Sequence, residues 1–202
     1  MVEFLQQKAL DIEGVRILGC TLWTDIPTDQ RIYKSIWGRM NDYRCIVKKI
    51  DEGDREREEA AILEWGSDIS PEQRQKIVDN TLKRGDRGLE PQDTRRWHKS
   101  DVLWLEAEAK KAADLDLPVV VLTHHSPVPC AETNLEFLSN PVTFACATDL
   151  RHLFRDPVRV WAYGHTHVKY DKRQGQTRVL SNARGYVHNL VGDYDPELIV
   201  EV

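Results

Sequence analysis

The chain has 202 residues, of which 41% are hydrophobic and 30% are charged, and its formal net charge is -5. A chain of this length can bury one hydrophobic core, so we expect a single soluble domain over residues 1–202. The nearly balanced charge excludes a broadly basic surface and gives no indication of nucleic-acid binding, whereas a small phosphate ester would need only local positive charge.

The N-terminal residues and the cysteines indicate where in the cell the protein is expected. The opening MVEFLQQKAL lacks a basic stretch followed by an apolar one, and no apolar run approaches the roughly 20 residues of a membrane span. The four cysteines are far apart and form no Cys-x-x-Cys pair: Cys20, Cys45, Cys130 and Cys146. We therefore expect a cytoplasmic protein without a membrane partner, whose thiols are reduced and are buried or inert. The sequence indicates no oligomeric state.

In chain order, the first half of the sequence predicts one buried strand and several helical segments. Residues 14–23 mix β-branched, aliphatic and small side chains without helical spacing, which is typical of a buried strand. Apolar side chains recur at helical spacing over residues 31–50, although Asn41-Asp42 interrupts the pattern. Residues 48–60 are too highly charged to contribute to a core, and Ser70-Pro-Glu-Gln predicts a helix that ends near Gly85.

The second half alternates helices and strands. The spacing predicts a long helix over residues 91–115, followed at once by a continuous apolar strand over residues 117–123. One stripe of this helix is formed by His98, Val102, Leu105, Ala109 and Ala112. Downstream we expect a short helix at 148–154, a strand at 158–163, a hairpin of 167–172 with 177–181, and a final strand at 197–202. We therefore predict an α/β fold.

Two of the predicted buried strands end in histidine clusters. Residues 119–123 lead into His124-His125-Ser-Pro, and residues 158–163 lead into Gly164-His-Thr-His167. In open α/β sheets, ligands bind beyond the carboxyl ends of the strands, so both clusters lie where a site would form. Imidazole is a common ligand of zinc, manganese and iron, which makes these histidines candidate metal ligands.

Backbone geometry limits which of these histidines can share a metal ion. Residues two apart on an extended backbone point the same way, so His165 and His167 can converge, and Gly164 lets the chain pass close to a metal or phosphate. Adjacent residues on a strand point to opposite faces, so only one of His124 and His125 would readily face the metal. The alternative is that these histidines are satisfied residues at strand ends.

The other histidines belong to weaker patterns. His98 and His152 lie on predicted amphipathic helices, where a core-edge or capping role is the simpler interpretation. His188 has no assigned role.

The histidine motifs occur together with further motifs. Thr123-His-His-Ser-Pro127 and Gly164-His-Thr-His167 are followed by Thr177-Arg-Val and Ser181-Asn-Ala-Arg-Gly-Tyr186. With this set the chain resembles the calcineurin-like metallophosphoesterases. Leu22-Trp-Thr-Asp25 and Met40-Asn-Asp-Tyr-Arg44 extend the resemblance over nearly the whole chain.

This resemblance implies a four-layer α/β/β/α sandwich with two mixed sheets. It also implies two divalent metal ions (zinc, manganese or iron) and hydrolysis of a small phosphate mono- or diester. Matched residue by residue, His124 and His165 would bind one ion and His167 the other. His125 and Arg184 would contact the substrate or support the ligands.

Three motifs of the family are missing from this chain: Asp-x-His, Gly-Asp-x-x-Asp with the bridging carboxylate, and Gly-Asn-His-Asp or Gly-Asn-His-Glu. Gly53-Asp54 and Gly85-Asp86 share only a dipeptide with the second motif. Histidines alone cannot supply the anionic bridge that two close dications need. We therefore expect an N-terminally incomplete domain without a complete catalytic set, which holds at most one metal ion by itself.

Two other functions stay open. A non-catalytic scaffold, or an interaction domain that binds a single metal, would account for the missing motifs. A metal-dependent amidohydrolase would also contain His-x-His, but those enzymes place it on the first barrel strand, whereas here it lies in the last quarter of the chain. Arg178 and Arg184 are candidates for phosphate contacts or for shaping a turn.

Overall fold

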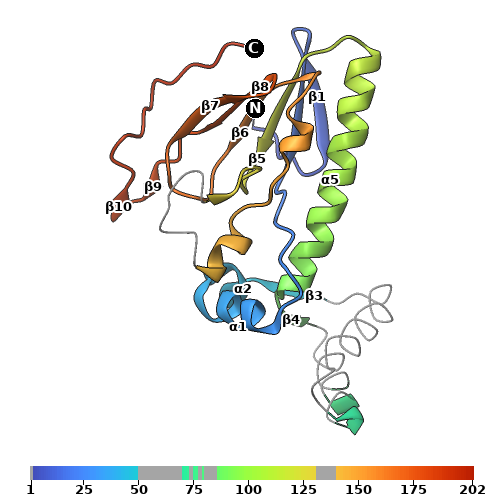
Figure 1. Ribbon diagram of the computed structural model, residues 1–202, viewed down its shortest axis with the longest axis vertical. Helices are drawn as coiled ribbons and strands as arrows, with labels where there is room; N and C mark the ends of the chain where they lie inside the picture. Colours follow the sequence, from blue (N-terminus) through green and yellow to red (C-terminus); the bar gives the residue numbers. More distant parts are fainter. Residues whose placement is uncertain (1, 50–69, 73–74, 77–78, 80–85, 131–139) are drawn as a thin grey trace. The chain divides into compact units, whose positions relative to one another are not determined.

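A computed structural model of the chain describes residues 2–49, 70–72, 75–76, 79, 86–130 and 140–202. The chain forms two compact units, one of Met1–Ile36 with Pro91–Val202 and one of Trp37–Glu90. The first unit contains the main sheet (Figure 1). The second unit contains α2 (Asn41–Cys45) and the antiparallel pair of β3 (Val47–Lys49) and β4 (Asp86–Gly88).

A mixed six-stranded sheet forms the centre of the first unit, in the order β1-β2-β5-β6-β8-β7 (Figure 1). The four central strands are parallel, and the two outer strands, β1 and β7, run antiparallel to their neighbours. The carboxyl ends of β2, β5, β6 and β8 therefore meet at one edge, which we call the carboxyl edge. The strand bounds are β1 (Lys8–Ile12), β2 (Val15–Cys20), β5 (Val119–Thr123), β6 (Val158–Tyr163), β7 (Tyr170–Gln174) and β8 (Thr177–Ser181).

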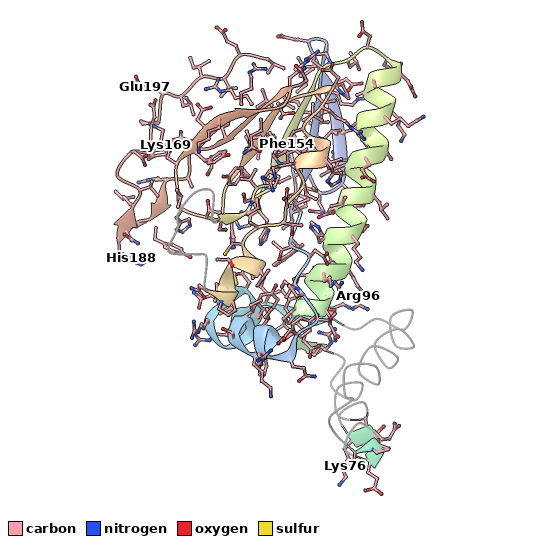
Figure 2. The ribbon with its side chains drawn as sticks, viewed as in Figure 1. Lys76, Arg96, Phe154, Lys169, His188 and Glu197 are labelled. Carbon is pink, nitrogen blue, oxygen red and sulfur yellow. The ribbon has the colours of Figure 1, made fainter. Side chains whose placement is uncertain are left out.

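Helix α5 (Pro91–Asp114) packs along this sheet and closes the core. The predicted stripe is confirmed, because Leu105 and Ala112 are buried in the core and Val102 and Ala109 pack against it. Burying a leucine side chain of this kind stabilises a fold by about 1.5–3 kcal/mol. Phe154, labelled in Figure 2, lies in the segment before β6 and meets the buried Trp161 of β6 edge to face at 5.7 Å between ring centroids.

Most predicted elements are present with shifted bounds. The strands predicted at residues 14–23, 117–123 and 158–163 are β2, β5 and β6, and the predicted hairpin is β7 with β8. The helical pattern after residue 30 divides into α1 (Gln30–Arg39) and α2, with the break at Met40. The short helix expected at 148–154 is a single 3-10 turn, η4 (Arg151–Leu153), which follows η3 (Pro141–Ala145).

The strand predicted at residues 197–202 is wrong. Its alternating pattern needs a partner backbone, and the amides at its start are instead used in a local turn. Glu197 N donates to Asp195 Oδ1, and Leu198 N donates to Asp195 O. Ile199 is 83% exposed. The strands near this end are the two-residue pair β9 (Gly185–Tyr186) and β10 (Asn189–Leu190).

Strand β1 was not predicted. It pairs with β2 through the two-residue turn Glu13-Gly14, in which both residues have positive φ, at 49° and 82°. Such turns favour Asn or Asp at the first position, so glutamate concealed the hairpin.

Several sequence-based expectations concern residues outside the described part of the chain. Most of the charged stretch 48–60, part of the helix predicted from Ser70 to Gly85, and the dipeptide Gly53-Asp54 fall there; the described residues at 71–72, 75–76 and 79 are helical. None of the four cysteines, all of which lie in the described residues, forms a disulfide; Cys45 is exposed and the others are buried or half-buried. Of the described helices, none is long and apolar enough to cross a membrane.

The α/β class is confirmed. Apart from the six-stranded sheet, the sheets in the described residues are the two-stranded pairs β3-β4 and β9-β10.

Candidate functional site

Three histidine rings meet at the carboxyl edge. His124 and His125 follow β5, and His165 follows β6. The ring centroids lie 4.3 Å apart for His125 and His165, 4.7 Å for His124 and His165, and 5.0 Å for His124 and His125. His165 Nδ1 is 2.9 Å from His124 Nε2, within hydrogen-bond distance. We call these three residues the histidine cluster.

The two adjacent histidines both reach the cluster because β5 ends before them. The strand ends at Thr123, so the rule that neighbouring side chains point to opposite faces no longer applies to His124 and His125. A hydrogen bond from Gly164 N to His124 O (3.1 Å) then ties the two strand ends together. The expectation that only one of these two rings would face the site does not hold, since both contact the ring of His165.

His125 is the buried member of the cluster, with 1% of its surface exposed. Its Nδ1 lies 3.2 Å from Thr21 O, and because a carbonyl oxygen only accepts, Nδ1 must carry the proton. The lone pair is therefore on Nε2, which is buried and has no hydrogen-bond partner. Burial, and then the neighbouring His165 and His124, lower the pKa of His125 well below 6.5, so the ring is neutral at pH 7.

Other buried polar atoms at the same edge also lack hydrogen-bond partners. They are Thr24 Oγ1 beyond β2, Thr166 Oγ1 beyond β6 and Ser181 Oγ at the end of β8. Buried polar groups are nearly always paired, so a group of unpaired ones needs an explanation such as a ligand, an ion or water. The carboxyl ends of all four parallel strands contribute to this group.

The backbone of His125 is held by a chain of two hydrogen bonds from the sheet. Trp161 Nε1 donates to Thr123 Oγ1 at 3.0 Å, and Thr123 Oγ1 donates to His125 O at 2.8 Å. The indole of Trp161 is buried, so this chain anchors the site to the core.

The turn after β2 lies beside the cluster and has an unusual backbone. Leu22 and Trp23 have φ values of 70° and 36°, in the left-handed region that disfavours non-glycine residues. Two side chains of α5 fix this turn: His98 Nδ1 donates to Leu22 O at 2.7 Å, and Asp101 Oδ2 accepts from Leu22 N at 2.9 Å. The turn presents Thr21 O to His125 and brings the rings of Trp23 and His125 to 5.0 Å.

Both clamping side chains are buried and have shifted pKa values. Burial lowers the pKa of His98 and raises that of Asp101. His98 is thus buried in the core, deeper than the core-edge or capping role that was predicted. Asp101 was not predicted, because its partners Gln6, Gln7 and Leu22 are distant in sequence.

His167 takes a different direction from His165. Both residues have positive φ, at 52° and 62°, so the backbone is not extended and the rule for residues two apart does not apply. The ring of His167 meets that of Tyr186 at 4.5 Å. Gly164, between β6 and His165, has no positive φ, and a Cβ there would make only ordinary contact, with His124 O at 3.8 Å.

The two candidate arginines lie outside the cluster. Arg178 makes two hydrogen bonds with Asp171, at 2.9 and 2.7 Å, which occupy its guanidinium group. Arg184 is exposed, and its carbonyl accepts from Val191 N in the β9-β10 turn. The structure therefore supports a turn-shaping role for Arg184 and an ion pair for Arg178.

The remaining histidines have surface contacts. His152 is exposed, with Nε2 at 3.6 Å from Glu106 Oε1, so of the core-edge and capping roles expected for it the core-edge role is wrong. His188, labelled in Figure 2, stacks on Tyr186 at 5.5 Å.

The described part of the chain contains no group of three or more His, Cys, Asp or Glu residues arranged to hold a metal ion. In the histidine cluster the His124 and His165 nitrogens are 2.9 Å apart. Two nitrogens on a tetrahedral zinc ion would be about 3.3 Å apart. The rings would therefore have to separate by a few tenths of an ångström to share an ion.

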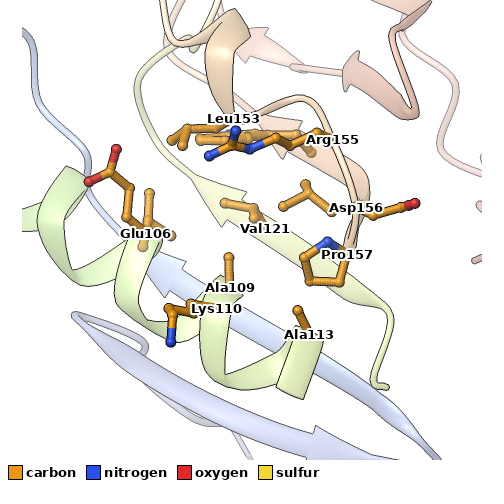
Figure 3. A pocket seen from close by; sticks show the side chains of 12 residues that line it. Glu106, Ala109, Lys110, Ala113, Val121, Leu153, Arg155, Asp156 and Pro157 are labelled. Atoms are coloured by element: carbon orange, nitrogen blue, oxygen red, sulfur yellow. The ribbon is translucent and has the colours of Figure 1, made fainter. Parts of the chain in front are cut away.

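A pocket of about 530 Å³ lies along the body of β5 and β6 rather than at their carboxyl ends. Figure 3 shows Ala109, Lys110 and Ala113 of α5 on one side, Leu153 and Arg155 on the other, and Val121 between them. Its lining contains no histidine or cysteine. We therefore place the candidate site at the histidine cluster.

No family model matches the chain. The chain is similar to the uncharacterized protein L509 of Acanthamoeba polyphaga mimivirus, with 21% identity over 206 residues. The match covers 98% of this chain and 59% of the viral protein, so the chain spans less than two thirds of the length of that relative.

Proposed function

We propose that this chain is part of a metal-dependent phosphoesterase and that the histidine cluster supplies part of its metal site. The observation that carries the proposal is the meeting of His124, His125 and His165 at the carboxyl edge, with the lone pair of His125 Nε2 buried and unpaired. Three imidazoles suit zinc, manganese or iron. A bound divalent ion would act as a Lewis acid toward the phosphoryl oxygens of a small phosphate ester.

The chain's own residues hold the cluster in a defined state. Thr21 O keeps the proton of His125 on Nδ1, which leaves Nε2 as the ligand atom. The chain from Trp161 through Thr123 fixes the backbone of His125. His124 and His165 would supply the other two nitrogens after release of the proton that their hydrogen bond shares, so the proposed set adds His125 to the two ligands that the resemblance implies for one ion.

The proposed site is incomplete for two ions. His167 is the ligand that the resemblance implies for a second ion, and a bridging carboxylate would be needed to hold two dications close together. Since no Asp or Glu forms a metal-holding group with the cluster among the described residues, catalysis on two ions would need carboxylates from elsewhere.

We also propose that the six-stranded sheet is one of the two sheets of a four-layer sandwich. Its parallel centre and the packing of α5 support this assignment. Leu122, on the inner strand β5, is 38% exposed, and a second sheet would bury side chains of this kind.

A non-catalytic domain that binds one metal ion is the second candidate. The absence of the three carboxylate-containing or histidine-containing upstream motifs of the family from the sequence favours it. It differs from the first candidate in predicting metal binding without hydrolysis.

The test combines zinc titration by calorimetry with hydrolysis of bis-p-nitrophenyl phosphate in zinc or manganese. We expect one zinc ion per chain, and we expect His165→Ala to weaken zinc binding by more than about 100-fold, because it removes a direct ligand. His152→Ala is the matched control, since it removes an exposed histidine outside the cluster.

The outcomes separate the two candidates. Zinc binding together with metal-dependent hydrolysis that is lost in His165→Ala supports the phosphoesterase. Zinc binding without hydrolysis supports the single-metal domain for this chain. A wild-type chain that takes up neither zinc nor manganese refutes both.

A further inference from the structure

A groove lined by aromatic side chains lies next to the histidine cluster. It has a volume of about 420 Å³, and its walls include Phe4, Trp23 of the turn after β2, and Trp97 of α5. Trp23 and Trp97 are half-buried, with ring centroids 5.8 Å apart and planes tilted by 45°. Phe4, which also lines the groove, is 82% exposed. Flat apolar surface is therefore open to a ligand at this position.

The groove and the cluster share one row of rings. Trp97 contacts Trp23, Trp23 lies 5.0 Å from His125, and His125 lies 4.3 Å from His165. A molecule that places one group at the histidine cluster would thus have its next group over Trp23. The 5.0 Å between the rings of Trp23 and His125 corresponds to a short linker between the two groups of such a molecule.

The polar side chains that line the groove present no charged group to solvent. Lys and Arg do not occur in the lining, and the carboxylate of Asp101 is buried and accepts from Gln6, Gln7 and Leu22. A phosphate group would find no cation there. The side-chain oxygen of Gln7 and the hydroxyl of Ser100 can bond the polar edge of a flat ring, since Gln7 uses its amide nitrogen on Ser100 and Asp101.

The turn that carries Trp23 into the groove has an unfavourable backbone conformation. Leu22 and Trp23 both have left-handed φ values, and each such residue costs about 1–3 kcal/mol. With this backbone conformation, the indole of Trp23 lies between the rings of Trp97 and His125 and contacts both. Strain of this kind is concentrated at sites that bind ligands.

We infer that the groove lined by Trp23 and Trp97 binds a nucleobase, so that the substrate is a phosphate ester of a nucleoside with its phosphate at the histidine cluster. The inference rests on the proposed phosphoesterase function for the phosphate end of the ligand. A base is favoured over a plain aryl ring because its ring nitrogens and exocyclic groups match the polar edge offered by Gln7 and Ser100.

The test measures binding of adenosine 5′-monophosphate, adenosine and ribose 5-phosphate to the chain by calorimetry, with and without zinc. Stacking of one base is expected to make adenosine 5′-monophosphate bind about 10- to 100-fold more tightly than ribose 5-phosphate. Trp97→Ala should remove most of this difference, and Trp97→Phe should retain most of it. Trp37→Ala is the control, because Trp37 is 57% exposed and lies on α1, outside the groove.

The outcomes for the groove and for the metal site can be distinguished. If adenosine and adenosine 5′-monophosphate bind equally and both depend on Trp97, the base site stands and the phosphate site fails. If adenosine 5′-monophosphate and ribose 5-phosphate bind the wild-type chain equally, the inference is overturned whatever the hydrolysis assay shows. Should Trp97→Ala be unfolded by circular dichroism, Trp97→Leu replaces it, and undiminished base binding in that variant also overturns the inference.

Discussion

The clamp on the turn after β2 leads to a specific prediction for Asp101. Asp101→Ala removes the acceptor of the buried Leu22 amide, together with the acceptor shared by the Gln6 and Gln7 side chains. The glutamine amides are near the surface and can bond water, whereas Leu22 is fully buried, so its amide loses its partner outright. A buried donor left unpaired costs about 1–3 kcal/mol.

We therefore expect Asp101→Ala to lower the free energy of unfolding by about 2 kcal/mol. Part of the loss is offset, because the burial that raises the pKa of Asp101 also makes its carboxylate costly to keep in the fold. For a chain of this size, 2 kcal/mol corresponds to a fall in Tm of about 4–8 °C. Asp101→Asn keeps an oxygen for the Leu22 amide and should lose about half as much.

The assay is thermal and urea unfolding followed by circular dichroism, with tryptophan fluorescence as a second signal for Trp23. Asp114→Ala is the control on the same helix, because its side chain is 69% exposed and should change stability by less than about 0.5 kcal/mol. The clamp would be refuted if Asp101→Ala unfolded at the wild-type temperature, or if Asp101→Asn lost as much stability as Asp101→Ala.

Three further predictions concern the same unit. Because burial lowers the pKa of His98, the unfolded chain binds a proton at a pH where the folded chain does not. The free energy of unfolding is therefore full above the unfolded pKa of about 6.5 and falls as the pH drops toward the folded pKa. The fall is at most about 1.4 kcal/mol per pH unit. His98→Asn keeps a donor for Leu22 O, and urea unfolding at pH 7.5 and 5.0 should show a smaller loss than in the wild type; an equal loss would contradict the assignment. Gly175→Ala should cost more than about 1 kcal/mol by thermal unfolding, because Gly175 has φ 58° and a Cβ would lie 2.5 Å from Phe154 O, whereas Gly164→Ala should leave Tm nearly unchanged. Thr123→Val breaks the hydrogen bonds that link Trp161 to the carbonyl of His125. If the proposed metal site is correct, this variant should bind zinc about 10-fold more weakly by calorimetry. Thr28→Val, at an exposed threonine, is the control.

The central elements of the fold were predictable because their patterns are local. Helix α5 has a regular apolar stripe, and β5 and β6 are short apolar runs that follow turn residues. The failures involve partners that local patterns do not show. Residues 197–202 alternate like a strand but have no described strand beside them, and β1 exists because it pairs with β2.

The candidate site was predictable in its position but not in its geometry. The strand-end rule placed both histidine clusters at one edge, and the structure brings His124, His125 and His165 together there, whereas the ring of His167 meets Tyr186. The rules for side-chain direction failed because His165 and His167 have left-handed φ values, which no spacing rule indicates. The contribution of Asp101 depends on a contact with Leu22 across 79 residues, which a single sequence does not reveal.

The distribution of strain and unpaired polar atoms supports the carboxyl edge as the functional region. Four non-glycine residues with positive φ lie there: Leu22, Trp23, His165 and His167. At about 1–3 kcal/mol each, this strain is comparable with a large share of the 5–15 kcal/mol that stabilises a typical domain. Several buried polar atoms at the same edge lack hydrogen-bond partners, and each of these also lowers stability. The large pocket beside α5 is lined mainly by well-packed side chains of the core and by charged residues at its rim. Among the residues that the structure describes, strain, unpaired polar atoms and clustered imidazoles occur together at the carboxyl edge. A fold that needed only stability would not retain this combination, whereas a site that binds a ligand and an ion would gain from each part of it.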